Sequence, residues 1–530
     1  MSDDDDKSAP VIPEELSKET RKFRKKKQLS DDEIDKGPRR TREKVIPKNT
    51  SDDEIDGMDT DDLLDQADKL PSKIVSSSLR RRRRLQRAKP ANRPSVTKKK
   101  PEIKKKVVVT DPQRARLLAD QYPDSYWQFH ADTEYDMIGA INEDNPLEVV
   151  NCHISDQAPI IGMTLSKDGM LLATFSNVGN VKIWDVGDQF ALVRKLRDAE
   201  EANIDEFYCG QFASADGSVI ATGGKLKDRH RWSAEDDDSH ILPCPIKIFD
   251  LEKCTVIGKL HGHAEEILCI KSLTFMNENY YISTSQDGYI IKWQMEDDWT
   301  TLKTSTRMED GITCMAFTVS FLPNTGNKYF LAACDGHLRL YDFEEAQLMQ
   351  TFEDMYSSYC DCGKFIQWLD DEEEEVDIET MQVDEPGRAW FISRGAEMCD
   401  VEEGVSSIPN ACKLHKLIYP TEQGQLFQLQ EVKKYMDKDY HANSWLVKIT
   451  SNGRYILAPT IYGQIFVFNM QTGKVSAVMK EHDDVEVRDV ILHPYRPLLF
   501  SSGDDGCVKV YTYKYTSEEN AVESLDVAMA

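Results

Sequence analysis

The chain has 530 residues and a formal net charge of −27, from 66 basic and 93 acidic residues. No apolar run approaches the ~18 residues of a membrane span, and the acidic N-terminus lacks the apolar region of a secretory signal. The 12 cysteines are scattered from Cys152 to Cys507, which is typical of free thiols in a reducing compartment. These features predict a soluble intracellular protein with no membrane contact.

The charge is divided unevenly along the chain. Residues 1–110 hold 30 of the basic and 22 of the acidic residues, which leaves 36 basic and 71 acidic residues for 111–530. The result is a basic arm of +8 on an acidic body of −35. Such a body repels nucleic acid, so any contact with nucleic acid is expected from the arm.

Residues 1–110 contain no Trp, Tyr or Cys, and Phe23 is their one Phe. A segment of this composition buries too little apolar surface to offset its ordering entropy. We therefore predict a disordered tail over 1–110, with acidic and basic blocks.

Within the tail, the string SDDEID occurs twice, beginning at Ser30 and Ser51. Three acidic residues after each serine resemble the sites of acidophilic kinases such as casein kinase 2. Phosphorylation would add about −1.5 to −2 charges at each serine. The two serines are therefore candidate phosphosites in a charge switch, and accidental low complexity is the alternative.

A basic patch follows in the same tail. Residues 69–106 hold 16 basic residues and one acid, Glu102. The densest part comprises Arg80, Arg81, Arg82, Arg83, Arg84, Arg87 and Lys89. This pattern predicts nuclear import and is compatible with non-specific contact to the phosphate backbone. No aromatic residue is interleaved there, so base stacking is not indicated.

Residues 111–150 lead from the tail into a body with a different composition. Aromatic and β-branched residues and turn dipeptides then recur at regular spacing, which is the all-β pattern. Seven blocks follow, each an apolar strand, a turn, a second apolar strand and usually an aromatic residue. They are residues 171–185, 219–250, 281–293, 330–342, 389–420, 455–469 and 499–511.

The repeated block resembles the WD40 repeat, whose members fold as β-propellers with one four-stranded sheet per blade. The resemblance implies an all-β, seven-bladed WD40-type propeller over 151–515, after the charged tail and before a disordered C-terminus at 516–530. In this family the first strand often completes the last blade. Residues 135–141 or 147–154 are the candidates for that ring-closing strand.

The resemblance also assigns a hydrogen-bonded chain of four side chains, a tetrad, to individual blades. In the third repeat the matching residues are His263, Ser283, Asp287 and Trp293, and in the seventh they are His482, Ser501, Asp505 and Tyr511. A phenol replaces the indole in the seventh repeat. The first repeat has Val178 where the turn Asp belongs, and the fifth and sixth repeats depart further from the pattern.

Three insertions interrupt the minimal repeat, at 225–244, 370–385 and 396–412. The first and third fall between the second and third strands of their units, so they are expected at one rim of the ring. Trp232 is a candidate aromatic anchor for binding there, and packing onto its own blade is the alternative. The second insertion has ten acids and no base. It predicts either a solvated loop or a docking strip for a basic partner.

Motifs of catalysis are not found in the sequence, since no phosphate loop, G-x-S-x-G elbow or H-E-x-x-H is present. We expect no catalytic residue, metal or cofactor, and the HGH at 261–263 is interpreted as structural. Alternation along a strand predicts that Cys360 and Cys362 point to one face as core thiols.

The combined features favour a non-enzymatic nuclear scaffold that joins protein partners, in chromatin or transcription complexes. Histones or other basic proteins would suit the acidic body. A ubiquitin-ligase substrate receptor is one alternative, but its usual Trp-Asp-x-Arg is absent because Val186 and Gly187 follow Trp184–Asp185. Ribosome biogenesis is a second alternative, which rests on the basic tract. The oligomeric state is not indicated.

Overall fold

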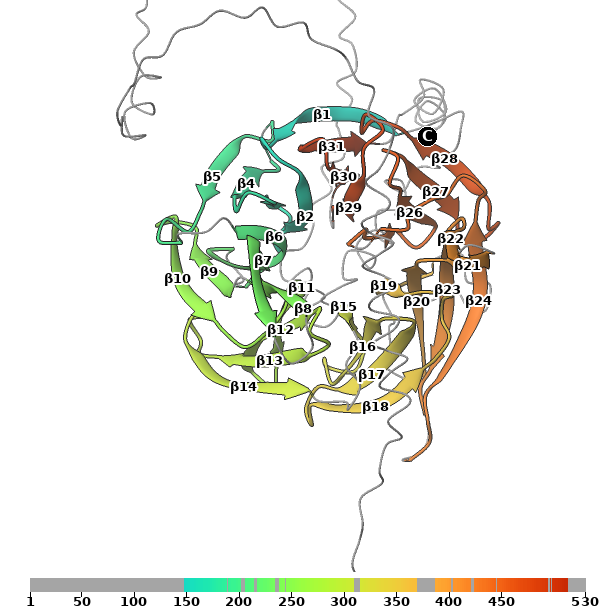
Figure 1. The fold of residues 1–530 in the computed structure, drawn as a ribbon, viewed down its shortest axis with the longest axis horizontal. Coiled ribbons are helices and arrows are strands. Elements are labelled where there is room, and N and C mark those ends of the chain that lie inside the picture. The colour runs from blue at the N-terminus through green and yellow to red at the C-terminus, as the bar shows by residue number, and fades with distance from the viewer. Residues whose placement is uncertain are drawn as a thin grey trace, which may run out of the picture. The chain divides into compact units, whose positions relative to one another are not determined.

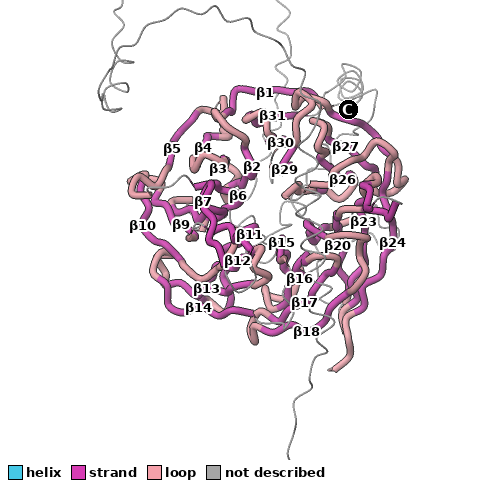
Figure 2. The backbone as a smooth tube through the Cα atoms, in the orientation of Figure 1, coloured by secondary structure: helices cyan, strands magenta, loops and turns pink. Residues whose placement is uncertain are grey.

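The computed structural model describes residues 147–512 except 188, 202–204, 214–216, 234–237, 244, 309–314, 369–386, 402–403, 421–423, 445, 494–495 and 497. Within these residues the chain forms 31 strands, arranged as a ring of blades (Figures 1 and 2). The innermost strands line a central cavity, termed the channel. The sequence rich in β-branched and aromatic residues accounts for this preference for strands.

The first four blades follow one another along the chain. Blade 1 comprises β2 (Ile160–Leu165), β3 (Leu171–Ser176), β4 (Val181–Asp185) and β5 (Leu192–Leu196). Blade 2 comprises β6 (Asp205–Phe212), β7 (Val219–Ser233), β9 (Ile246–Asp250) and β10 (Thr255–Leu260), with β8 (Asp238–Pro243) paired to β7. Blade 3 comprises β11 (Ile267–Phe275), β12 (Glu278–Ser285), β13 (Ile290–Met295) and β14 (Leu302–Met308). Blade 4 comprises β15 (Ala316–Phe321), β16 (Tyr329–Cys334), β17 (His337–Asp342) and β18 (Gln347–Phe352).

Three further blades complete the ring. Blade 5 comprises β19 (Cys360–Ile366), β20 (Arg388–Gly395), β23 (Ala411–Ile418) and β24 (Gln428–Met436), with a separate hairpin of β21 (Met398–Val401) and β22 (Gly404–Ser407). Blade 6 comprises β25 (Thr450–Ser451), β26 (Tyr455–Pro459), β27 (Ile465–Asn469) and β28 (Val475–Met479). Blade 7 comprises β29 (Val487–Leu492), β30 (Leu498–Gly503), β31 (Cys507–Thr512) and β1 (Glu148–Ser155).

The ring is closed by the pairing of β1 with β31. The two strands are antiparallel, with Glu148 opposite Thr512 and Ser155 opposite Cys507. Figure 1 shows the first and last described strands side by side at the outer edge of blade 7. Of the two candidate ring-closing segments, 147–154 therefore takes this position, and 135–141 lies outside the described residues. Closure removes open sheet edges that would otherwise invite pairing with other chains.

The hydrophobic core lies between neighbouring blades. One cluster joins blades 7 and 1, where Ile154, Phe500 and Val508 pack with Leu172 and Trp184. Equivalent clusters join the other blades. The innermost strands are accordingly buried along their length, whereas outer strands such as β10 and β14 alternate or face solvent. Each blade is thus stabilised mainly by its neighbours.

The innermost strands share a local irregularity near their first residues. In six of them the pairing with the second strand skips one residue, which marks a β-bulge. The skipped residues are Ile161, Tyr208, Leu268, Phe317, Asp361 and Arg488. This bulge gives a common register to the residues that follow it in each blade.

The bulge makes the prediction for Cys360 and Cys362 wrong. Cys360 packs with Leu338 and other residues of blade 4, whereas Cys362 packs with Tyr440 and residues of blade 6. The extra residue, Asp361, shifts the alternation by one, so the two buried thiols point to opposite faces of blade 5.

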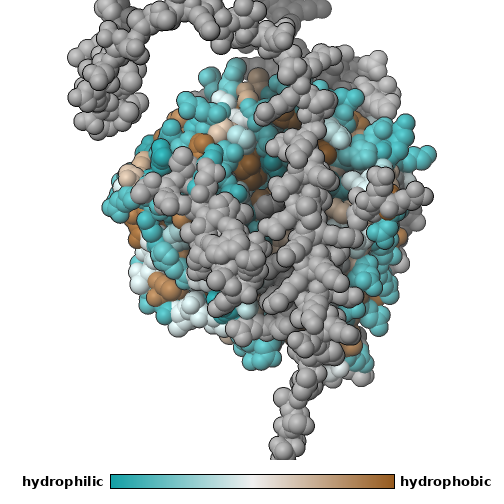
Figure 3. Space-filling view, in the orientation of Figure 1, coloured by the Kyte–Doolittle hydropathy of each residue, from teal (hydrophilic) through white to brown (hydrophobic). Residues whose placement is uncertain are grey.

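The predicted fold class, an all-β seven-bladed propeller, is confirmed by this arrangement. The predicted tail at 1–110, the lead-in before 147, the acidic insertion at 370–385 and the C-terminus at 516–530 lie outside the described residues. In the view of Figure 3, hydrophilic side chains predominate along the described edge of the ring, with smaller apolar patches between them.

Candidate protein-interaction face

The tetrad of blade 3 has the geometry of a continuous hydrogen-bonded chain. Trp293 Nε1 lies 2.8 Å from Ser283 Oγ, and Ser283 Oγ lies 2.7 Å from His263 Nε2. His263 Nδ1 then lies 3.1 Å from Asp287 Oδ2. The carboxylate of Asp287 can only accept, so Nδ1 carries the hydrogen of the neutral ring. The bare Nε2 then accepts the hydroxyl hydrogen of Ser283, whose oxygen accepts from the indole N–H. The chain therefore fixes the tautomer of His263.

Asp287 is the acceptor at the end of this chain. It also accepts from the backbone amides of Ala264, at 2.8 Å, and Tyr289, at 2.9 Å. Burial would raise the pKa of Asp287, but the hydrogen bonds and His263 outweigh burial and hold the pKa below its usual value. The carboxylate thus ties the loop before β11 to the β12–β13 turn, where Gly288 has a positive φ of 82°.

Blade 7 repeats this chain with a phenol at its buried end. His482 Nε2 lies 2.7 Å from Ser501 Oγ, and His482 Nδ1 lies 3.1 Å from Asp505 Oδ2. Tyr511 Oη lies 3.2 Å from Ser501 Oγ. The structure therefore brings together all eight residues that the sequence assigned to the two tetrads.

Blade 5 carries a related chain that sequence analysis missed. Ser393 Oγ lies 2.8 Å from both Tyr356 Oη and His415 Nε2. His415 takes the strand position that Trp293 has in blade 3, because it pairs with the residue two before the serine. Burial and, secondarily, Lys413 lower the pKa of His415 to about 3, so the ring is neutral.

Glu397 lies beside the blade 5 chain and is bonded to Ser357, the residue after Tyr356. It follows Ser393 by four residues, as Asp287 follows Ser283, and its carboxylate accepts from Ser357 Oγ at 2.6 Å and from Ser357 N at 3.2 Å. The four-residue spacing between serine and acid was the available signal.

Blade 1 keeps part of this hydrogen-bonded chain, and blade 2 replaces it with an ion-pair cluster. In blade 1, Trp184 Nε1 donates to Thr174 Oγ1 at 3.2 Å. In blade 2, the fully buried Lys247 pairs instead with Asp198, Glu201 and Asp205 at 2.6–3.3 Å. A buried cation with several acidic partners thus holds the incoming loop that a His–Asp pair holds in blade 3.

An apolar cluster of bulge residues gathers where the innermost strands begin. Ile161, Tyr208, Leu268 and Phe317 pack with Tyr359, whose ring stacks on Phe317 at a centroid distance of 5.7 Å. The bulge residues come from blades 1 to 4 and Tyr359 directly precedes β19 of blade 5, so the cluster joins five blades at one mouth of the channel.

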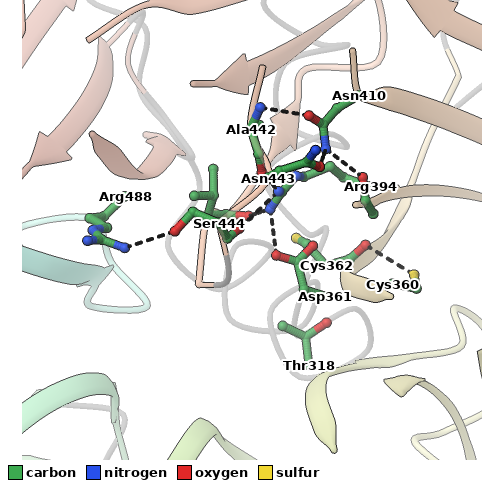
Figure 4. Close-up of polar contacts among 12 residues, drawn as sticks. Thr318, Cys360, Asp361, Cys362, Arg394, Asn410, Ala442, Asn443, Ser444 and Arg488 are labelled. Carbon is green, nitrogen blue, oxygen red and sulfur yellow. Dashed lines mark hydrogen bonds and ion pairs between the residues drawn. The ribbon is translucent and has the colours of Figure 1, made fainter. Parts of the chain in front are cut away.

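An ion-pair network adjoins this cluster at the junction of blades 5, 6 and 7 (Figure 4). Arg394 is fully buried and donates to Asp361 Oδ2 at 2.5 Å and to the carbonyls of Ala442, Ser444 and Val447. Arg488 then pairs with Asp504 through two bonds of 2.8 and 2.9 Å. This two-bond pair fixes β29 against the β30–β31 turn, whereas the loop before blade 6 is held by its carbonyl bonds to Arg394.

One repeat of the ring matches a known family, and the match agrees with the seven-bladed fold. The family described as "WD domain, G-beta repeat" matches residues 473–512, the stretch that contains β28 to β31 and the whole tetrad of blade 7. The chain is a WD40-repeat β-propeller protein. Such propellers generally bind other proteins, and their fold is typically a non-enzymatic interaction scaffold.

One curated relative of the WD40 chain is Kinesin-like protein KIF21B of Mus musculus. It is 22% identical over 210 residues, which cover 37% of this chain and 11% of that protein. The chain therefore matches only a small part of that relative's length.

Two inserted hairpins lie on one rim of the WD40 ring. The β7–β8 hairpin joins the second and third strands of blade 2, and β21–β22 does so in blade 5. Because second-to-third connections all return to the same side, both hairpins lie where the innermost strands begin. This rim is termed the hairpin rim. Trp232 lies in β7 opposite Ser239, and its side chain lies outside the described set.

The remaining candidate residues of the tail, from Ser30 to Lys89, also lie outside the described residues. Across the described ranges, no helix is long and apolar enough to cross a membrane. The same part of the WD40 chain has no group of three His, Cys, Asp or Glu side chains placed to hold a metal ion.

Glu266 is an unusual carboxylate on the hairpin rim. It immediately precedes β11, is fully buried and pairs with Lys225 Nζ at 3.7 Å. Burial raises the pKa of Glu266 to about 7, and Lys225 offsets only part of this rise. The side chain therefore changes its charge close to neutral pH.

Proposed function

We propose that this WD40 protein is a non-enzymatic nuclear adaptor whose hairpin rim binds protein partners. The rim has two hairpins that are not needed to close the ring. The tetrads and the contacts of Arg394 hold other loops of the same rim in place. A preorganised surface loses little entropy on binding, which favours affinity. The basic tail would supply nuclear import and non-specific contact with nucleic acid.

The observation that carries the proposal is an exposed aromatic side chain on this rim. Tyr462 lies in the turn between β26 and β27, and it is 53% exposed. Its ring lies 6.2 Å from that of His441, nearly at a right angle. Tyrosine is one of the residue types enriched among the hot spots of protein interfaces. We therefore assign Tyr462 as an anchor for partners.

Charge supports a basic partner. Residues 111–530 have a net charge of −35, and a field of this sign accelerates encounter with positively charged proteins. Histones or other basic proteins in chromatin or transcription complexes fit this chemistry. The acidic insertion at 370–385 supplies ten of the negative charges in this sum.

A purification from cells tests the binding face. Tyr462→Ala should lower recovery of basic nuclear partners at least fivefold, because truncation of an interface anchor costs about 1–2 kcal/mol or more. The matched control is Met276→Ala, since Met276 is 67% exposed in the β11–β12 turn on the opposite rim. Equal losses for both variants would contradict the assignment of the rim. Recovery of only cullin components, or of pre-ribosomal particles, would replace the adaptor proposal with one of its alternatives.

Localisation is tested separately. Replacing Arg80 to Arg84 with alanine removes five charges from the basic patch, and the variant should shift from nucleus to cytoplasm in fluorescence images. Replacing Lys98, Lys99, Lys100, Lys104 and Lys105 with alanine removes the same number of charges and should have a smaller effect. Unchanged nuclear accumulation of the arginine variant would reject this patch as the import signal.

A further inference from the structure

Exposed apolar side chains gather on the hairpin rim where blade 5 passes into blade 6. They surround residues 437–444, the first part of the loop between β24 and β25, which is termed the rim loop. Val401 is 47%, Met436 is 49% and Tyr462 is 53% exposed. Large apolar side chains that are exposed together, rather than singly, mark surfaces that bind other molecules.

Contacts with the rim loop place these three side chains around it. Met436 is the last residue of β24 and directly precedes the loop. The ring of Tyr462 packs against that of His441 in the loop. Asn443 Nδ2 donates to the hydroxyl of Ser407 in β22, and β21 of the same hairpin carries the valine. The apolar side chains therefore belong to one part of the rim, although they come from three segments.

Buried groups hold the rim loop from the interior of the protein (Figure 4). Arg394 donates to the carbonyls of Ala442 and Ser444. Asn410 Oδ1 accepts from Ala442 N at 2.7 Å, and Asn410 Nδ2 donates to Asn443 Oδ1 at 2.6 Å. Because the loop is fixed before a partner arrives, the surface around it loses little entropy on binding.

Acidic side chains border this apolar surface. Five aspartates there are half-buried or exposed: Asp400, Asp437, Asp439, Asp483 and Asp484. Lys438 and Lys480 are exposed beside them, and Lys434 is paired with Glu397 at 3.5 Å. Five aspartates and two lysines leave a balance of −3 in these groups. The border therefore attracts cations.

The backbone at Asp483 and Asp484 is strained. Their φ angles are 32° and 57°, in a region that costs free energy for residues other than glycine. The preceding residue, His482, is fixed in the tetrad of blade 7, which maintains the strain. A Cβ on Gly463 would lie 2.8 Å from Asp484 N, so this strained turn adjoins the turn that carries Tyr462.

We infer that the surface around the rim loop binds a short segment of a partner protein in which apolar side chains are flanked by lysine or arginine. The apolar side chains of the segment would pack on Val401, Met436 and Tyr462 and leave water. Its cations would face the bordering aspartates. This inference rests on the proposed binding role of the hairpin rim and specifies the chemistry of the partner.

Selection of phage-displayed random dodecapeptides on the full chain tests this chemistry. The selected peptides should have a net positive charge and apolar residues next to lysine or arginine. The variant Val401→Ser/Met436→Ser should bind them at least tenfold more weakly than the native chain. The control Ile257→Ser/Met349→Ser removes two apolar side chains of outer strands, which are 37% and 44% exposed, and should bind like the native chain.

A second variant tests the aspartates without disturbing their backbone. Asparagine tolerates positive φ as aspartate does, so Asp483→Asn/Asp484→Asn removes two charges and keeps the turn. This variant should bind the selected peptides severalfold more weakly at low salt, and its affinity should depend less on salt. An unchanged affinity and salt dependence would overturn the role of the acidic border.

The outcomes separate this inference from the proposed function. If Tyr462→Ala weakens peptide binding and Val401→Ser/Met436→Ser does not, the rim remains a binding face but the inference fails. If neither variant weakens it, both proposals fail. Selection of acidic peptides would also overturn the inference. Tighter peptide binding after replacement of Arg80 to Arg84 with alanine would assign the surface to the chain's own basic tail instead of a partner.

Discussion

Ser393 lies between Tyr356 and His415 as Ser283 lies between His263 and Trp293. In both blades a hydroxyl receives one hydrogen bond and passes on its own. The residue types at the two ends differ, and what persists is a buried path of donors and acceptors. The identity of each residue matters less than its role in that path.

Because the two serines have equivalent roles, removing either hydroxyl should lower the free energy of unfolding by a similar amount. Ser283→Ala and Ser393→Ala each leave a buried donor without its acceptor, so each should lower the free energy of unfolding by about 1–3 kcal/mol. Ser305→Ala, on the exposed outer strand β14, should change it by less than about 0.5 kcal/mol. Denaturant unfolding measures all three. If Ser283→Ala lowers the free energy of unfolding and Ser393→Ala does not, the blade 5 chain is not equivalent to that of blade 3.

The buried carboxyl group of Glu266 should make the stability of the fold depend on pH. Its pKa is about 7 in the folded chain against 4.5 for an ordinary glutamate, so the folded state holds the proton more tightly. The stabilisation from Glu266 is therefore complete below pH 4.5 and is lost as the pH rises to about 7.

Glu266→Gln should consequently raise the free energy of unfolding by about 1–3 kcal/mol at pH 8 and leave it nearly unchanged at pH 4.5. Unfolding curves at the two pH values measure the difference. Glu296→Gln, at a half-exposed position of blade 3, serves as the control for removing one acidic side chain. A variant that is less stable than the native chain at pH 8 would mean that the charged form has a structural role.

The tetrads of blades 3 and 7 were predictable because their residue types and spacing keep the repeat pattern. Blade 5 was missed because His415 replaces an aromatic and Tyr356 replaces a histidine, which hides the pattern from motif matching. The pair of Arg394 with Asp361 was also not visible. It joins residues 33 apart and depends on a bulge that changes which way a side chain points.

At the scale of elements, β1 is the strand that closes the ring. It supplies the outer strand of blade 7, and Ile154 alone contributes a fully buried side chain to the junction with blade 1. Its strand pairing was anticipated from the resemblance to the WD40 family, in which the first strand often completes the last blade, with 135–141 and 147–154 as the two candidates. The short hairpin β21–β22 could not be anticipated, because its sequence has no apolar alternation.

A chain that begins at residue 156 should therefore be less stable than one that begins at residue 147. Loss of Ile154 accounts for about 2–5 kcal/mol by itself, and the unpaired edge of β31 adds to the loss. Thermal unfolding of the two truncated chains gives the comparison without interference from the tail. Identical melting of the two would contradict a closing role for β1.

At the scale of the whole molecule, the separation of charge between arm and body governs association. The arm of +8 attracts polyanions, and the body of −35 repels them. The net affinity for nucleic acid should depend on small changes in the arm and decrease steeply with salt.

Treatment with an acidophilic kinase should therefore weaken binding of the full chain to duplex DNA severalfold, because two phosphates remove about three to four charges from the arm. The Ser30→Ala/Ser51→Ala variant should bind DNA normally and lose the response to the kinase. Fluorescence anisotropy at several salt concentrations measures both. Equal affinity before and after phosphorylation would remove the proposed switch.

The seam between β1 and β31 also sets the order of events during synthesis. Residues 148–155 leave the ribosome early, but their partner at 507–512 is made more than 350 residues later. Six blades are therefore translated while one strand edge of the ring remains unpaired, a condition that exposes an intermediate to misassembly. Premature termination anywhere before β31 leaves that edge open, so truncated products of this chain are expected to depend on chaperones and to be degraded.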